Sequence, residues 1–160
     1  MSYPNTFYEK RLAKASDPRE AVWAADPEQW AAVKLESTTI CTQYIHPGDR
    51  VLDAGCGIGE LVECLPPNTD YYGIDYCGGF IQVARERYPD YRFAVCDLLD
   101  LSGFTDGSFD LVICRTVEGV LGEVWPGVLT ELRRIGRRVL VFRARLLVGD
   151  TLETVKVFTE

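Results

Sequence analysis

An aspartate and three closely spaced glycines have the types and spacing of a ligand-binding loop. The segment 51–61 reads VLDAGCGIGEL, in which Asp53 ends a short apolar run and Gly55, Gly57 and Gly59 follow at every second position. Glycine lacks a Cβ atom, so its backbone tolerates positive φ and lets a bound molecule approach closely. The segment therefore predicts a strand, a glycine loop and the start of a helix, with a nucleoside ligand beside the loop.

The spacing of these glycines distinguishes two kinds of ligand. A dinucleotide site uses G-x-G-x-x-G, with the third glycine three positions after the second, whereas here the interval is two. The carboxylate of Asp53 would also repel a pyrophosphate group at the end of this strand. A cationic or zwitterionic ligand suits the loop better, and a tight turn without any ligand is the structural alternative.

A second aspartate, Asp75, ends the next apolar run, YYGID at residues 71–75. In a doubly wound sheet, an acid at the tip of the second strand is placed to accept two hydrogen bonds from a ribose diol. The segment 92–98 predicts a third strand with Asp97 near its end, and 106–114 predicts a turn and a fourth strand. The carboxyl ends of these four strands should converge on one crevice.

Taken together, these segments resemble the class I S-adenosylmethionine-dependent methyltransferases. The resemblance rests on VLDAGCGIGEL, on the acid that ends the second strand and on DGSFDLV at residues 106–112, and it runs from about residue 48 to 142. It implies that the chain is a methyltransferase. It also implies that S-adenosyl-L-methionine is the cofactor and S-adenosyl-L-homocysteine the product.

The same resemblance implies a set of cofactor contacts. In the family, the glycine loop lies under the methionine moiety, and the acid of the first strand contacts it directly or through water. The residue after the second acid often flanks the adenine. The acid after the third strand hydrogen-bonds the adenine amino group, and the backbone amide of its neighbour meets a ring nitrogen. The cofactor-binding residues implied for this chain are Asp53, Gly55, Cys56, Gly57, Gly59, Asp75, Tyr76, Asp97, Leu98 and Arg115. For Tyr76 the alternative is an aromatic residue on a surface turn.

Candidate substrate contacts come from two segments that are able to close over the carboxyl ends of the strands. In the resembled family, an N-terminal segment with an aromatic residue near an arginine often folds over the cofactor. Tyr8 and Arg11 are therefore candidates within a lid of residues 1–25, and a loosely held arm is the alternative. Arg115 suits the cofactor carboxylate or an anionic substrate, and Glu118 suits a cationic substrate, unless both are capping or surface charges. No catalytic base is assigned, because no imidazole follows the fourth strand and alignment and desolvation can suffice for this displacement.

The composition narrows the class of protein. The chain has 160 residues, 47% of them hydrophobic, which suffices for one globular domain over 1–160 and not for two ordinary ones. Its net charge of −7 opposes nucleic-acid binding. The apolar runs are too short to span a membrane and the N-terminus lacks a signal-peptide core, so a cytoplasmic location is expected. The six cysteines form no C-x-x-C pair, and no metal site is expected.

The elements together predict an α/β fold, a doubly wound Rossmann-like sheet of parallel order 3-2-1-4-5 with helices on both faces. Asp-Pro pairs predict helix starts at 17–18 and 26–27, and Trp125-Pro126 predicts another. A short helix is expected at 60–65. The segment 146–158 predicts a hairpin whose last strand runs antiparallel beside the fifth, so the sheet should be trimmed at its C-terminal end.

The function expected from the sequence is methyl transfer to a small molecule. No motif marks a nucleic-acid methyltransferase, and no recognition domain accompanies the cofactor motifs. Two alternatives stay open. One is an accessory or regulatory module that binds S-adenosylmethionine without methylating anything, and the other is a methyltransferase of protein or RNA. The sequence predicts neither a particular acceptor nor an oligomeric state.

Overall fold

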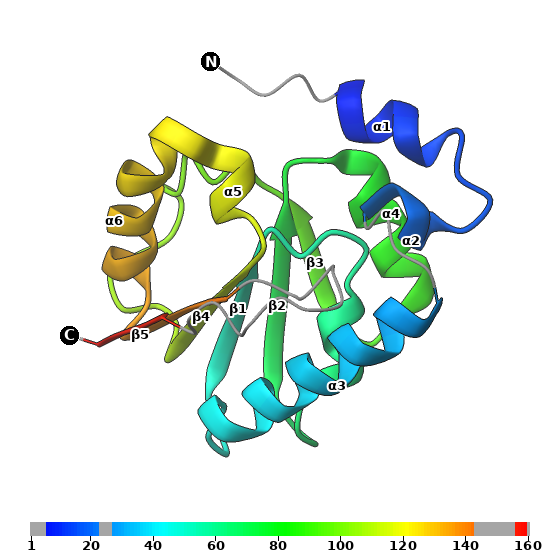
Figure 1. The fold of residues 1–160 in the computed structure, drawn as a ribbon. Coiled ribbons are helices and arrows are strands. Elements are labelled where there is room, and N and C mark those ends of the chain that lie inside the picture. The colour runs from blue at the N-terminus through cyan, green and yellow to red at the C-terminus, as the bar shows by residue number, and fades with distance from the viewer. Residues whose placement is uncertain (1–5, 23–26, 143–155, 160) are drawn as a thin grey trace.

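The computed structural model describes residues 6–22, 27–142 and 156–159. Its centre is a six-stranded sheet in the order β3-β2-β1-β4-β5-β6 (Figure 1). The strands are β1 (Arg50–Ala54), β2 (Asp70–Asp75), β3 (Arg92–Val95), β4 (Leu111–Arg115), β5 (Arg138–Phe142) and β6 (Lys156–Thr159). β1 to β5 are parallel, and β6 runs antiparallel to β5. The predicted strand order and the predicted antiparallel edge strand are both confirmed.

Helices cover both faces of this sheet (Figure 1). One face carries α3 (Pro27–Tyr44), the 3-10 helix η1 (Glu60–Cys64) and α4 (Gly78–Arg87). The other carries α6 (Trp125–Ile135), which is preceded by α5 (Glu118–Leu121) and the 3-10 helix η2 (Gly122–Val124). Two N-terminal helices, α1 (Thr6–Leu12) and α2 (Pro18–Val22), lie beside α4. Among the helices within the described residues, none combines the length and the apolar character needed to cross a membrane.

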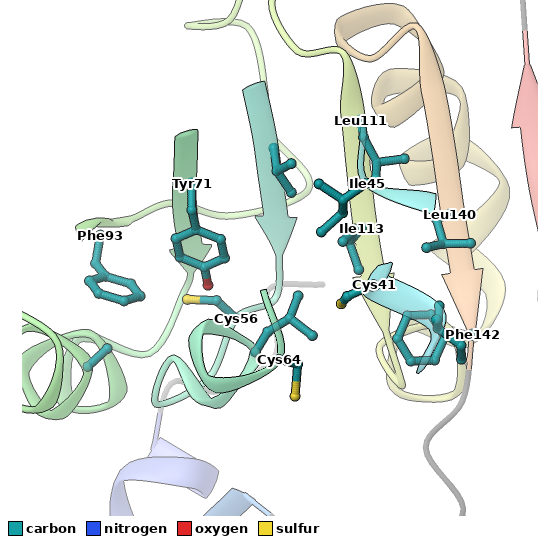
Figure 2. Packing of buried hydrophobic residues seen from close by; sticks show 14 of the residues in the cluster. Cys41, Ile45, Cys56, Cys64, Tyr71, Phe93, Leu111, Ile113, Leu140 and Phe142 are labelled. Atoms are coloured by element: carbon teal, nitrogen blue, oxygen red, sulfur yellow. The ribbon is translucent and has the colours of Figure 1, made fainter. Parts of the chain in front are cut away.

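Alternation along the strands produces two buried apolar clusters. Successive residues of a strand point to opposite faces, so Val51 packs on the α3 side and its neighbour Leu52 on the α6 side. Figure 2 shows part of the first cluster, with side chains from several strands meeting those of α3 and η1. Within the described residues, the buried polar side chains are Ser37, Asp53 and Asp75. Each of the three has a hydrogen-bond partner, as the burial of a polar group requires, and Asp53 and Asp75 lie where the sequence predicts the site.

Three local predictions differ from the structure or lie outside it. Within the segment 60–65, Glu60–Cys64 forms a short 3-10 helix, because Pro66 follows too soon for a longer helix. The third strand ends at Val95, earlier than predicted, since the N–H of Cys96 donates to the last carbonyl of β2 and the chain then turns. The hairpin predicted at 146–158 lies mostly outside the described residues, and β6 contains its last part.

Candidate functional site

The loop between β1 and η1 is held against β2 by its own backbone. The N–H groups of Gly55 and Cys56 both donate to the carbonyl oxygen of Ile74, at 2.8 and 2.9 Å. The N–H of Gly57 donates to Oδ2 of Asp75 at 2.9 Å. Gly55 has φ of 83°, in the left-handed region that other residues rarely adopt. The loop therefore requires glycine for its shape and crosses the carboxyl ends of β1 and β2.

Two valines from distant segments lie over this loop, and neither was predicted from the sequence. A Cβ atom on Gly55 would come within 2.4 Å of Cγ2 of Val117, and one on Gly57 within 3.5 Å of Cγ1 of Val22. Val22 ends α2, and Val117 lies in the connection after β4. The two segments predicted to close over the site thus supply apolar walls to the loop.

The third glycine of the loop, Gly59, has a packing role. A Cβ atom on this residue would approach Cζ of Phe93 to 2.9 Å and Cδ2 of Tyr88 to 3.1 Å. Its φ is 80°, so it both turns the chain into η1 and leaves room for two aromatic rings. A cofactor contact for Gly59 stays a prediction.

Asp75 ends β2 and links the glycine loop to the start of α4. The residue is 7% exposed. Oδ2 accepts the N–H of Gly57, and Oδ1 accepts the N–H of Cys77 at 2.9 Å. Burial raises the pKa of this carboxyl, and backbone N–H groups around it oppose the rise by stabilising the ionised form. Each carboxylate oxygen has a second lone pair, so the predicted bonds to a ribose diol are compatible with these contacts.

Asp53 is buried more deeply, with 2% exposure. Its Oδ2 accepts the hydroxyl of Tyr71 at 2.8 Å. Burial raises the pKa of Asp53 to about 6, and the negative charge of Asp75 contributes to this rise. The positive charge of Arg115 and the hydrogen bond from Tyr71 act in the opposite direction. Two buried carboxylates therefore interact at the carboxyl ends of neighbouring strands. Such a pair favours a cation as ligand.

At pH 7.5 the ionised Asp53 should destabilise the ligand-free protein. Its folded-state pKa of about 6 lies above the value of about 4 in an unfolded chain, so the folded state holds the proton more tightly. The contribution of this group to the free energy of unfolding therefore falls as the pH rises from about 4 to 6. We expect Asp53→Asn to raise the free energy of unfolding by roughly 1 to 3 kcal/mol at pH 7.5, and the gain to vanish near pH 4.

Asp110 provides a control of opposite sign. Its Oδ2 accepts the backbone N–H and the guanidinium of Arg50, at 2.9 and 3.1 Å, and these hydrogen bonds lower its pKa. Asp110→Asn should therefore reduce stability at pH 7.5, and this loss should disappear once the pH falls below the lowered pKa. Urea unfolding of both variants at several pH values measures the two effects. A less stable Asp53→Asn variant at pH 7.5 would contradict the expected cost of burying that charge.

Arg115 ends β4 on the same side of the sheet as Asp53. Its Nη1 donates to Oγ of Ser37 at 3.2 Å, and Ser37 is fully buried in α3. The structure thus brings Arg115 close to the acid of the first strand, where its charge lowers the pKa of that acid. Glu118 begins α5, and its side chain lies outside the described part of the chain. Contacts of both residues with cofactor or substrate stay predictions.

The predicted adenine contacts lie just beyond β2 and β3. Oδ1 of the exposed Asp97 accepts the N–H of Leu99 at 3.0 Å and so shapes the turn after β3. Leu98 is buried, and Tyr76 is half-buried directly after Asp75. Because β2 and β3 are parallel neighbours, these residues share the edge of the sheet on which the glycine loop lies.

The N-terminal arm packs on the domain beside these residues. The ring centroid of Tyr8 lies 5.5 Å from that of Phe80 and 6.2 Å from that of Tyr76. Arg11 turns instead toward α2, where its Nη2 donates to the carbonyl oxygen of Glu20 at 3.0 Å. The structure therefore brings Tyr8 to the predicted adenine side of the site. It places Arg11 in a contact within the arm.

Comparison with known proteins agrees with this geometry. Residues 51–138, from β1 to the start of β5, match the family described as methyltransferase domain. The chain belongs to this family. The resemblance to class I S-adenosylmethionine-dependent methyltransferases is thereby confirmed.

The methyltransferase domain has relatives with several kinds of name. It is 30% identical over 122 residues to the ubiquinone biosynthesis O-methyltransferase of Xanthomonas campestris, and the aligned region covers 71% of this chain and 51% of that protein. It is 39% identical over 67 residues to the probable tRNA methyltransferase 9B of Mus musculus, and the aligned region covers 42% of this chain and 14% of that protein. The chain thus spans about half the length of these relatives, or less.

A solved structure confirms the fold class of the methyltransferase domain. Phosphoethanolamine N-methyltransferase 1 of Haemonchus contortus, in complex with phosphoethanolamine and S-adenosylhomocysteine, is similar with a TM-score of 0.70 and 19% identity. The match covers 94% of this chain and 34% of that one. At this level of identity the similarity establishes the fold, and the function must be argued from the site.

Proposed function

We propose that this methyltransferase domain binds S-adenosyl-L-methionine and transfers its methyl group to a small-molecule acceptor. The observation that carries the proposal is the pair of buried carboxylates, Asp53 and Asp75, beside a glycine loop. S-adenosylmethionine offers a sulfonium, an amino group and a ribose diol, and this chemistry matches two buried carboxylates. A pyrophosphate would meet two negative charges in the same place, which argues against a dinucleotide.

The roles that we assign are the ones that the family resemblance implies. The methionine end belongs to Asp53, Arg115 and the loop 55–59, the ribose to Asp75, and the adenine to Tyr76, Asp97 and Leu98. When bound, the cofactor supplies the methyl group of its sulfonium, and S-adenosyl-L-homocysteine, a neutral thioether, is the leaving group. The chain supplies alignment and exclusion of water, for which Val22 and Val117 form apolar walls at the loop.

The charge and the arginine contacts support a small acceptor over a nucleic acid. The chain carries a net charge of −7. Its arginines near the end of α6 are engaged locally, since Arg134 donates to the carbonyl oxygens of Leu101 and Phe104 and Arg138 donates to that of Tyr44. The quinone-pathway relative also matches a larger share of this chain than the tRNA methyltransferase does. We propose that Tyr8, Arg115 and Glu118 face the acceptor, and that Arg11 joins them only by giving up the hydrogen bond of its Nη2 to the carbonyl oxygen of Glu20.

Two other functions are the alternatives to this proposal. An accessory or regulatory module would keep the cofactor site and show no turnover. A methyltransferase of protein or RNA would use the same cofactor on a larger substrate, and the name of the mouse relative favours this alternative. Since all three functions share the cofactor, they are separated by turnover and by the class of acceptor.

We also propose that residues 1–160 act as one domain in the cytoplasm. One continuous sheet with helices on both faces supports the single domain. All six cysteines have free thiols, five of them buried, and this supports a reducing compartment.

Calorimetric titration of the purified protein tests the cofactor assignment. We expect saturable binding of S-adenosyl-L-homocysteine with one site per chain, and no binding of NADH at the same concentrations. Binding of NADH in place of the sulfur nucleoside would overturn the proposed function.

A further inference from the structure

The ring of Tyr71 lies along the sheet and brings its hydroxyl to Asp53 on the neighbouring strand. In the register of β1 and β2, Tyr71 pairs with Val51 and Gly73 pairs with Asp53, so the ring spans two positions toward the carboxyl ends. Its hydroxyl donates to Oδ2 of Asp53 at 2.8 Å. Figure 2 shows the same ring with its hydroxyl directed toward Cys56 of the glycine loop.

Gly73 makes this reach possible. A Cβ atom on Gly73 would come within 2.9 Å of the Tyr71 hydroxyl and 2.7 Å of Cδ1 of Phe93. The rings of Phe93 and Tyr91 each lie with centroids 5.8 Å from that of Tyr71, at interplanar angles of 67° and 83°. A buried ring enclosed in this way keeps one orientation, so its hydroxyl is held at the carboxylate.

The titratable groups that interact with the Asp53 carboxylate come from four parts of the chain. Tyr71 and Asp75 of β2 and Arg115 of β4 act on its pKa, and the carboxylate in turn raises the pKa of the thiols of Cys56 in the glycine loop and Cys41 in α3. Tyr71 and Arg115 favour the ionised carboxylate, whereas burial and the charge of Asp75 disfavour it. Without the hydroxyl, Arg115 alone would oppose these two effects.

We propose that Tyr71 is a positioning residue of the cofactor site. Its hydroxyl occupies one oxygen of Asp53, holds the carboxylate in the ionised form and leaves the other oxygen for the amino group of the cofactor. The inference rests on the proposed function, because it requires that cofactor at Asp53. Tyr71 itself acts through the carboxylate and makes no contact with the ligand.

Tyr71→Phe tests this role, and Tyr72→Phe is its matched control. Tyr72 is the next residue of β2 and packs on the opposite side of the sheet, near Phe104 and Phe109. We expect Tyr71→Phe to weaken binding of S-adenosyl-L-homocysteine about tenfold at pH 7.5, since a hydrogen bond to a charged group is lost. Tyr72→Phe should leave the affinity unchanged.

The pH dependence of binding separates positioning from mere packing. The lost hydrogen bond stabilised the ionised form, so the pH at which affinity falls on acidification should move upward in Tyr71→Phe. A ¹³C NMR titration of aspartate carboxyls in the ligand-free protein should show the same upward movement for Asp53. A packing role would lower stability and leave both midpoints in place.

A double-mutant cycle gives a second readout. In an Asp53→Asn background, Tyr71→Phe should have no further effect on the affinity for S-adenosyl-L-homocysteine, because the hydroxyl acts through the carboxylate. Wild-type protein that binds this ligand, together with a Tyr71→Phe variant of unchanged affinity and pH midpoint, would overturn the inference alone. Wild-type protein that fails to bind it would overturn the proposed function and the inference together.

Discussion

Asp75→Ala should weaken the binding of S-adenosyl-L-homocysteine at least about 100-fold. The variant loses the acceptor for two ribose hydroxyls, and hydrogen bonds to a charged group are worth roughly 1.5 to 3 kcal/mol each. It also releases the N–H groups of Gly57 and Cys77, which the carboxylate holds at 2.9 Å. The loop and the start of α4 thereby lose their link. Calorimetric titration measures the change.

Asp70 provides the matched control, because it is an exposed acid at the opposite end of the same strand, where it pairs with Arg92. Asp70→Ala should leave the affinity unchanged. A 2′-deoxy analogue of the ligand separates a lost ribose contact from a disordered loop. Wild type should bind the analogue more weakly than the parent ligand. Asp75→Ala should bind the analogue and the parent ligand with the same affinity. If Asp75→Ala binds S-adenosyl-L-homocysteine as tightly as wild type, the ribose assignment is wrong.

Deletion of residues 1–16 should abolish methyl transfer while the sheet stays folded. The deletion removes α1, whose Tyr8 packs against Phe80 and lies beside Tyr76, and whose Leu12 approaches Gly79. Without α1, water should enter the side of the site next to α4, and the proposed acceptor should lose its contact with Tyr8. Turnover measures the effect, and circular dichroism checks the fold.

Point variants within α1 provide the control for this deletion. Tyr8→Ala should lower turnover, whereas Lys10→Ala changes an exposed residue of the same helix and should not. Full activity of the truncated protein would mean that the arm is no lid, and would favour an open site that faces a macromolecule.

The sheet and the acidic strand ends were predictable because local patterns specify them. Continuous apolar runs are typical of parallel strands, which are buried on both faces, and turns rich in glycine and proline separate these runs. Parallel strands bring their carboxyl ends to one edge, so the closeness of Asp53 and Asp75 followed from their places in the chain. The N-cap at Asp17 was predictable from the Asp-Pro pair alone. In the structure its Oδ1 accepts the N–H of Arg19 at 2.9 Å.

The contacts that complete the site were not predictable, since they depend on tertiary packing. The hydrogen bond of Tyr71 to Asp53 requires the register of two strands and the free space above Gly73. Val117 reaches the glycine loop from the connection after β4, which no local pattern indicates. The hydrogen bond of Arg11 to the carbonyl oxygen of Glu20 forms only when α1 packs against α2, so the sequence does not indicate it.

A radiolabelled methyl-transfer assay tests the proposed function most directly. Purified protein and S-adenosyl-L-methionine with a labelled methyl group are incubated with cell extract that has been split into small-molecule, protein and nucleic-acid fractions. We predict that label enters the small-molecule fraction with the wild type and not with Asp75→Ala. Label in bulk RNA or protein at rates well above any metabolite would contradict the small acceptor. Absence of transfer to every fraction, by protein that binds S-adenosyl-L-homocysteine, would contradict methyl transfer itself.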